Sequence, residues 1–246
     1  MTKTLILIPS RMGASRLPGK PLLKINNLSI ISHVFKKAEK TNIGEVVVAT
    51  ENNEILEDVK KNGGRGILTG SDHKTGTDRI FEAYKKLGSK DIDFILNLQG
   101  DEPNINTNDI INLNNFMIKN DSEIATLAAK IDDEEILNNK NVVKVITKNN
   151  LTEKNFSLAL NFTRNNLSKK YKNIYHHIGV YSYKVSALEK FVNLNQTKNE
   201  KENRLEQLRA LDNKIKINVV LAKSSPIGVD TEEDYLAIKK IMEYKS

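Results

Sequence analysis

Short apolar runs alternate with longer runs of helical spacing through the first half of the chain. The pattern predicts strands at Thr4–Ile8, Glu45–Ala49, Gly66–Thr69 and Phe94–Leu98, and helices at Ile30–Thr41, Asn53–Asn62, Gly76–Leu87 and Asn108–Lys119. This alternation is typical of an α/β fold with a doubly wound, mostly parallel sheet. Right-handed crossovers then place the carboxyl ends of the strands at one edge, where such folds bind ligands.

The pattern changes after about residue 122, where predicted strands follow one another with few helices between them. These strands are Glu123–Ala129, Val142–Thr147, Ser157–Phe162 and Tyr175–Tyr183. Helices are predicted at Val185–Val192, Glu202–Asp212 and Glu232–Tyr244, with a strand at Lys216–Ala222. We therefore expect a single domain over residues 1–246. Its α/β core covers about 1–129 and 216–246, and an inserted antiparallel lobe covers about 130–215.

Composition excludes several classes of protein and site. The chain has no cysteine, which excludes disulfides, thiol catalysis and thiolate metal sites. The apolar run Leu5–Ile8 ends at Pro9 and is too short for the core of a signal peptide. No other run approaches the length that a transmembrane helix needs, so we expect a cytoplasmic protein that does not enter a membrane.

The formal net charge of +7 suggests a basic nucleic-acid-binding protein as an alternative. However, the lysines are spread along several predicted helices, and the chain has no tryptophan. A single-strand binder would combine a basic groove with aromatic side chains on which bases stack. We therefore expect no nucleic-acid partner, and the charge could instead steer anionic substrates.

The first predicted strand runs into a loop of cations and glycines, namely Arg11, Gly13, Arg16, Gly19 and Lys20. Such a loop is suited to phosphate because cations and close backbone N–H groups attract anions. It is not a Walker A loop, since five residues separate Gly13 from Gly19 and Pro21 follows Lys20. It also lacks the dinucleotide-binding spacing. A solvated surface turn at Pro18 and Gly19 is the alternative.

Two aspartates are expected at the same edge of the sheet. Asp101 follows the strand Phe94–Leu98 through a turn at Gly100. A carboxylate beside a polyphosphate indicates a metal between them, and Mg²⁺ prefers one or two carboxylates with phosphate oxygens. The alternative for Asp101 is an Asx residue that caps the turn. Glu102 is left without a role.

The second aspartate, Asp230, follows the last strand and precedes the last helix. Thr231 and Asp234 fit a capping box, which would leave Asp230 outside the helix and free to bind a metal. Alternatively, Asp230 is itself the N-cap. Spacing alone does not separate the two.

Several of these segments together resemble one family. They are Pro9–Arg11 with Arg16–Pro21, Gln99–Pro103, His177–Tyr181, Leu205–Arg209 and Gly228–Thr231. Their order and spacing are similar to those of the 3-deoxy-manno-octulosonate cytidylyltransferases (CMP-Kdo synthetases) along nearly the whole chain. The resemblance implies a nucleotide-diphospho-sugar transferase-like fold. It also implies transfer of CMP from CTP to the anomeric hydroxyl of Kdo, with release of pyrophosphate, for lipopolysaccharide synthesis. Family members are magnesium-dependent cytosolic homodimers.

The resemblance also implies roles for individual residues. The catalytic residues would be Arg11, Lys20, Asp101 and Asp230, with Mg²⁺ held by Asp101 and Asp230. CTP would contact Arg11, Arg16, Lys20, Thr75, Gly76, Thr77, Arg79, Gln99 and Asp101. The sugar acid would contact Gln99, Arg164, His177, Tyr181, Glu206 and Gln207, with Arg164 and His177 suited to its carboxylate. Thr75 and Thr77 could also be helix N-caps, and a lone His177 could be an ordinary buried histidine.

One segment departs from the family pattern. Thr163–Lys170 lacks the family's proline, and the loop from there to His177 is short. Because this segment borders the expected sugar site, an amino-substituted Kdo or another 2-keto-3-deoxy sugar acid stays an alternative substrate.

Overall fold

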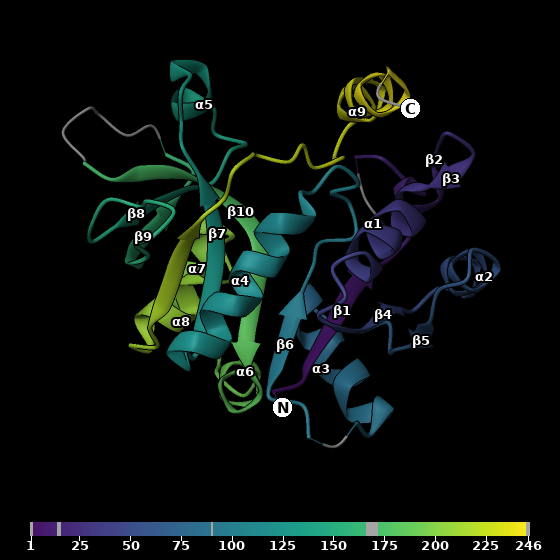
Figure 1. Cartoon of the computed structure of the whole chain (residues 1–246), viewed down its shortest axis with the longest axis horizontal. Helices are drawn as coiled ribbons and strands as arrows, with labels where there is room; N and C mark the ends of the chain where they lie inside the picture. Colours follow the sequence, from purple (N-terminus) through teal and green to yellow (C-terminus); the bar gives the residue numbers. More distant parts are fainter. Residues whose placement is uncertain (1, 14–15, 90, 166–171, 245–246) are drawn as a thin grey trace. The chain divides into compact units, whose positions relative to one another are not determined.

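Strand β1 (Thr4–Ser10) is the centre of the first of two units into which the chain divides (Figure 1). The computed structural model describes residues 2–13, 16–89, 91–165 and 172–244. In the first unit, residues 1–111 and 226–246, β1 lies between two parallel neighbours, β4 (Gly44–Thr50) and β6 (Phe94–Asn97). Strand β5 (Gly66–Leu68) pairs in parallel with β4. Leu5–Ile8 of β1 are fully buried, as expected of a central parallel strand covered on both faces.

Helices connect the parallel strands. Helix α1 (Ile30–Glu39) follows β1, α2 (Asn53–Lys61) follows β4, and α3 (Gly76–Leu87) follows β5. Helices α1 and α2 contact each other and β4, while α3 contacts β1 and β4. Short elements precede α1, namely the 3₁₀ turn η1 (Lys20–Leu22) and the hairpin strands β2 (Lys24–Ile25) and β3 (Leu28–Ser29). Helix α4 (Thr107–Asn120) crosses the boundary between the units, and α9 (Glu232–Tyr244) belongs to the first.

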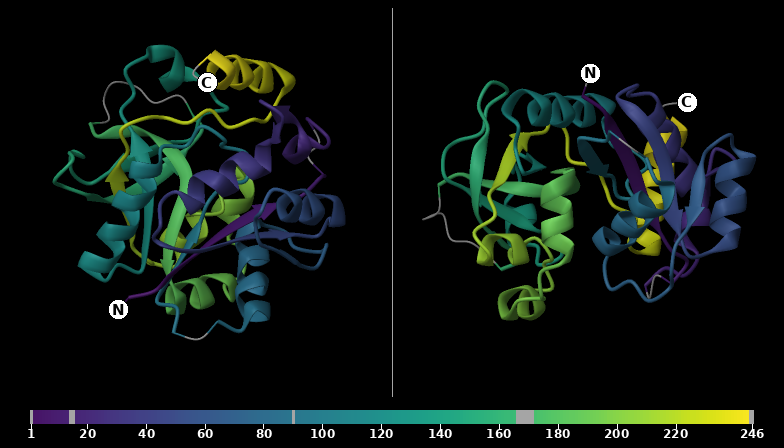
Figure 2. Two further views of the ribbon diagram at one scale, coloured as in Figure 1. Left: turned by 45° about the vertical axis from the view of Figure 1, so that its right-hand side comes forward. Right: turned by 90° about the horizontal axis from the view of Figure 1, so that it is seen from below.

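The second unit, residues 112–225, is built on a mostly antiparallel sheet (Figure 2, teal to yellow). Its strands are β7 (Ile124–Ala129), β8 (Lys144–Thr147), β9 (Ser157–Thr163), β10 (Ile174–Lys184) and β11 (Ile217–Leu221). The order is β10-β7-β11-β9-β8, and β8 also pairs with β10, so the sheet curls back on itself. Only β7 and β11 pair in parallel among the strands of this unit that the structure describes. The helices are α5 (Glu134–Asn138), α6 (Val185–Val192), α7 (Lys198–Asn203) and α8 (Leu208–Asp212).

The α/β class is confirmed, and two details differ from expectation. The units divide near residues 111 and 225, whereas the core was expected to include residues up to 129 and from 216. The reason is that β7 and β11 pair with each other and with β10 and β9. The single helix predicted at Glu202–Asp212 is wrong, because Arg204 has a φ of 53° and ends α7 in the left-handed region. None of the helices in the described part of the chain is long and apolar enough to cross a membrane.

A buried ion pair joins α7 to α8. Arg209 donates from Nε to Glu200 Oε2 at 2.9 Å and from its terminal nitrogen to Oε1 at 2.6 Å. The two side chains are only 3% and 4% exposed. Glu200 also completes a capping box with Thr197, accepting from the Thr197 backbone N–H at 3.2 Å. Glu200 therefore caps the start of α7, and its ion pair with Arg209 joins α7 to α8.

Replacing Glu200 with Gln should lower the free energy of unfolding by about 3 to 5 kcal/mol, because the buried guanidinium of Arg209 loses its bidentate anion and keeps only the Glu206 carboxylate, 3.8 Å away. Glutamine still fits the capping box, so the loss reports the charge. Urea denaturation followed by circular dichroism measures it. The matched control is Glu202→Gln, whose side chain is 62% exposed in its pair with Lys198 and should leave the urea midpoint unchanged. Equal effects of the two substitutions would contradict this account.

Candidate active site

A pocket of about 490 Å³ lies in the first unit, at the carboxyl ends of its parallel strands. Four segments line it: the end of β1 with the loop that follows (Pro9–Arg11, Gly13, Arg16, Lys20 and Pro21), the start of α3 (His73–Gly76 and Arg79), the turn after β6 (Gln99–Asp101) and Asp230 before α9. All residues expected to contact CTP line this pocket except Thr77, whose side chain is buried in α3. The topology thus brings together segments that are far apart in the sequence.

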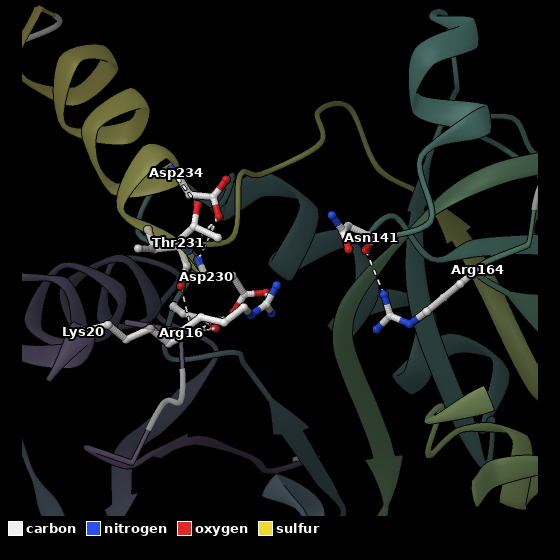
Figure 3. Close-up of polar contacts among 9 residues, drawn as sticks. Arg16, Lys20, Asn141, Arg164, Asp230, Thr231 and Asp234 are labelled. Atoms are coloured by element: carbon white, nitrogen blue, oxygen red, sulfur yellow. Dashed lines mark hydrogen bonds and ion pairs between the residues drawn. The ribbon is translucent and has the colours of Figure 1, made fainter. Parts of the chain in front are cut away.

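The ammonium of Lys20 lies among three acceptors (Figure 3). Its Nζ donates to Asp101 Oδ2 at 2.6 Å, to the Val229 carbonyl at 2.8 Å and to Asp230 Oδ1 at 3.0 Å. Arg16 donates to the other oxygen of Asp230, Oδ2, at 2.8 Å. Gly19, with a φ of 73°, makes the left-handed turn that begins η1 and presents Lys20. All three hydrogens of the ammonium are therefore used by the protein.

The charges of this cluster stabilise one another. Burial disfavours the charged form of Lys20, but attraction to Asp101 and Asp230 outweighs it and raises the pKa of Lys20. Burial likewise acts against the Asp230 carboxylate, yet Lys20 and Arg16 lower the pKa of Asp230 overall. Lys20 is therefore charged and Asp230 ionised at neutral pH.

Asp101 and Asp230 are suited to share one small cation, because both already contact the same ammonium. Within the described residues, no cluster of three or more His, Cys, Asp or Glu side chains forms a complete metal cage. Mg²⁺ commonly takes only one or two carboxylates and fills its other positions with phosphate oxygens and water. The oxygen donors of the two aspartates fit that requirement.

Helix α9 is capped by Thr231, which leaves Asp230 outside the helix. The Asp234 backbone N–H donates to Thr231 Oγ1 at 3.2 Å, and Asp234 Oδ2 accepts from the Thr231 backbone N–H at 2.9 Å. This is the reciprocal capping box (Figure 3). The alternative in which Asp230 is the N-cap is therefore wrong, and the Asp230 carboxylate is directed to Lys20 and Arg16 instead.

The start of α3 forms another wall of the pocket. Thr75 is the N-cap of α3, and its Oγ1 accepts from the Asp78 backbone N–H at 3.1 Å. Gly76 lies close to Pro9, because a Cβ at this position would come within 3.2 Å of the proline ring. Arg79 is 3% exposed and donates to Thr69 Oγ1 at 2.6 Å and to the Gly70 carbonyl at 3.1 Å. It also pairs with Glu51. Arg79 thus holds the preceding loop in place.

His73 is a pocket residue that the sequence interpretation did not single out. It pairs with Glu82, which also accepts from Lys86 at 2.6 Å and from the Gly70 backbone N–H at 2.8 Å. Burial alone would raise the pKa of Glu82, but these donors lower it to about 2. The sequence did contain a signal for a site role of His73. The residue lies just before Thr75 and Gly76, which were expected to contact CTP.

Glu102 also had no expected role. Its Oε2 is buried without a hydrogen-bond partner in the described structure. Burial, with a smaller contribution from the neighbouring Asp101, raises the pKa of Glu102 to about 8. Glu102 is therefore largely protonated at neutral pH, and a backbone turn rather than a charge pair holds it beside Asp101.

The second unit holds the other residues expected to contact the sugar acid. The rings of His177 and Tyr181 lie 5.5 Å apart, and Tyr181, Glu206 and Gln207 border a small cavity of about 30 Å³. Arg164 donates to the Asn141 carbonyl at 2.8 Å (Figure 3). Gln99 lies in the pocket of the first unit. The remainder of the divergent segment, residues 166–170, lies outside the described residues.

His177 lacks the positive charge that would pair with a carboxylate. Its Nε2 lies 3.1 Å from Thr126 Oγ1, and its ring packs edge-on against Phe162 at 5.0 Å. Burial, followed by the nearby charges of His176 and Arg164, lowers the pKa of His177 to about 3. A neutral imidazole can hydrogen-bond to a sugar acid but cannot supply a positive charge to its carboxylate.

The sequence matches the family model described as cytidylyltransferase over residues 5–217. The 3-deoxy-manno-octulosonate cytidylyltransferase of Nitrobacter winogradskyi is 42% identical over 241 residues, which cover 98% of this chain and 94% of the relative. The enzyme of the same name from Rhodopseudomonas palustris is 44% identical over 242 residues, covering 98% of each chain.

Solved structures agree with these relatives. The structure of CMP:2-keto-3-deoxy-manno-octonic acid synthetase complexed with CTP superposes with a TM-score of 0.90 at 32% identity, covering all of both chains. A UDP-glucose pyrophosphorylase superposes with a TM-score of 0.74 at 15% identity, which shows a shared fold alone. The chain therefore belongs to the 3-deoxy-manno-octulosonate cytidylyltransferase family.

Proposed function

We propose that this protein transfers CMP from CTP to the anomeric hydroxyl of Kdo and releases pyrophosphate. The observation that carries the proposal is the meeting of Lys20 with Asp101 and Asp230 in a pocket rimmed by Arg11 and Arg16. Such a site suits a polyphosphate with a divalent cation. The relatives named for this activity, and the similar synthetase bound to CTP, support cytidine as the base and Kdo as the acceptor.

The chemistry needs no nucleophile from the protein. The sugar hydroxyl gives its proton to solvent and forms a bond to the α-phosphorus. The bond from that phosphorus to the oxygen that joins the α- and β-phosphates breaks, and this oxygen leaves with pyrophosphate. Catalysis then depends on positioning and on stabilising charge. Arg11, Arg16 and Lys20 would neutralise the triphosphate and the leaving pyrophosphate. A magnesium ion held by Asp101 and Asp230 would lower the pKa of the attacking hydroxyl.

Lys20 would have two partners in succession under this proposal. In the structure its ammonium contacts both carboxylates that would hold the cation. When nucleotide and cation arrive, Lys20 would release the aspartates and turn its three donors toward phosphate oxygens. Positive charge stays beside the two carboxylates throughout, so their mutual repulsion is never left uncompensated.

The same proposal includes a homodimer in the cytoplasm that contributes to lipopolysaccharide synthesis. Support for association through the second unit comes from its exposed apolar side chains. Phe156 and Leu160, before and within β9, are 43% and 58% exposed, and Ile118 of α4 is 41% exposed. An apolar patch at a surface commonly marks a protein contact, and the ring of Phe156 packs against that of Phe116 of α4 with centroids 4.4 Å apart.

The proposed reaction can be tested by measuring pyrophosphate release with Mg²⁺, each of the four nucleoside triphosphates, and Kdo. We expect turnover with CTP only, and loss of turnover with EDTA. Turnover with an amino-substituted Kdo or another 2-keto-3-deoxy acid, and none with Kdo, would reject the substrate and keep the reaction class. Tight, strongly salt-dependent binding of RNA or DNA without any turnover would favour the nucleic-acid-binding alternative.

Asp230→Asn should raise the Mg²⁺ concentration needed for half-maximal activity about tenfold or more, because a carboxylate ligand is lost. It should lower the melting temperature only slightly, since Thr231 caps α9 and Asp101 still pairs with Lys20. Thr231→Val is the matched control: it should cost about 1 kcal/mol of stability and keep the magnesium dependence. An Asp230 variant that loses stability and keeps its magnesium dependence would contradict the metal role.

Lys20→Met should reduce kcat by about 100-fold or more, because a preorganised charge contact to the triphosphate is lost. It should also raise the affinity for Mn²⁺ measured by electron paramagnetic resonance without nucleotide, since the competing ammonium is gone. Lys24→Met, at an exposed position, should change neither quantity. Unchanged Mn²⁺ affinity in Lys20→Met would reject the exchange of partners.

A further inference from the structure

Lys144, the first residue of β8, is fully buried. Its Nζ donates to the Asn139 carbonyl at 2.9 Å and to the Arg164 carbonyl at 3.0 Å. No carboxylate contacts this ammonium in the described part of the chain, and residues 166–171, which lie outside it, include no Asp or Glu. A buried ammonium held only by neutral oxygens is costly, because buried charges normally have a counter-ion.

Other basic groups surround Lys144. It lies opposite His176 of β10 and Thr163 of β9 in the sheet register, and Arg164 follows Thr163 directly. Burial, with the nearby charge of Arg164, lowers the pKa of Lys144. Burial, with the charge of Lys144, lowers the pKa of His176, whose Nδ1 lies 2.5 Å from Ser225 Oγ. The cluster therefore favours an anion.

Lys144 also fixes the position of Arg164. Its ammonium binds the Arg164 carbonyl, while the Arg164 guanidinium donates to the Asn141 carbonyl. The bond from Lys144 to Asn139 ties the same loop, residues 139–141, from the other side. Lys144 thus holds the backbone of Arg164 directly, and the loop that Lys144 also holds binds the Arg164 guanidinium. Figure 3 shows the bond from the guanidinium to Asn141.

We propose that Lys144 is a positioning residue for the sugar acid: it holds Arg164 for the substrate carboxylate and adds a buried positive charge that this carboxylate offsets. The proposal rests on the proposed function, because it needs an acidic sugar as substrate. Lys144 is too buried to touch that substrate, so it acts through Arg164. His177 cannot take its place, since that imidazole is neutral.

The first test is steady-state kinetics of Lys144→Met, with Lys148→Met at an exposed position just after β8 as the matched control. We expect the KM for Kdo to rise at least about tenfold, because Arg164 is no longer held for its charge-assisted contact with the substrate carboxylate. The KM for CTP and kcat should stay within about twofold. The melting temperature should not fall, because replacing an unpaired buried charge by an apolar side chain is commonly neutral or stabilising.

A chemical rescue separates charge from shape. The chain has no cysteine, so Lys144→Cys introduces a single thiol. Aminoethylation in denaturant, followed by refolding, rebuilds an ammonium of nearly the length of lysine. Propylation gives a neutral side chain of the same length. We expect the aminoethyl form to restore the KM for Kdo and the propyl form to keep it raised. Equal KM values for the two forms would overturn the proposal.

The pH dependence of the KM for Kdo in the wild-type enzyme is a further test that needs no variant. Lys144, Arg164, His176 and His177 act on one another electrostatically here. Because burial and the charge of Arg164 lower the pKa of Lys144, the KM for Kdo should begin to rise below the ordinary lysine pKa as the pH increases. A KM for Kdo that stays constant over that range would count against Lys144. If no sugar acid supports turnover while CTP still binds, the proposed function fails instead.

Discussion

The contact of one ammonium with two aspartates organises the candidate nucleotide site. Lys20 lies 81 positions before Asp101 and 210 positions before Asp230, so the contact exists only when three distant segments are in place. Parallel pairing of β1 with β6 brings the loop of Lys20 beside the turn of Asp101. The Val229 backbone N–H then donates to the Asp101 carbonyl at 2.9 Å, which adds the segment before α9. The fold places two carboxylates near one another, and the ammonium of Lys20 compensates their mutual repulsion.

Much of this arrangement follows from the sequence because strand positions and strand ends are encoded locally. Apolar runs at Leu5–Ile8 and Phe94–Leu98 identify buried strands, and polar residues just after the strands of a parallel sheet meet at one edge. The capping pattern of Thr231 and Asp234 is local too, although its competition with Asp230 was decided only by tertiary contacts to Lys20 and Arg16.

The parts that sequence did not reveal depend on tertiary partners. Arg79 was expected to contact CTP and lines the pocket, but the sequence did not reveal that Glu51 and Thr69 from other elements engage its guanidinium. The division of the helix at Glu202–Asp212 depends on a left-handed Arg204, a conformation that arginine does not signal. The sequence predicted a strand at Val142–Thr147 but gave Lys144 no special role, because a lysine in a short strand normally faces solvent. Only the curled sheet, in which β8 pairs with both β9 and β10, buries it.

The clusters around Lys20 and Lys144 therefore differ in how their charge is compensated. In the first, Lys20 and Arg16 are matched by carboxylates of the protein, so the site folds without a ligand at little electrostatic cost. In the second, the ammonium of Lys144 is buried among carbonyl oxygens and basic neighbours, and the described residues offer it no anion. A site of the first kind must exchange partners when its ligand binds. The Lys144 cluster lacks a counter-ion in the described residues. An anionic substrate that binds there supplies one, so its binding should also stabilise the fold.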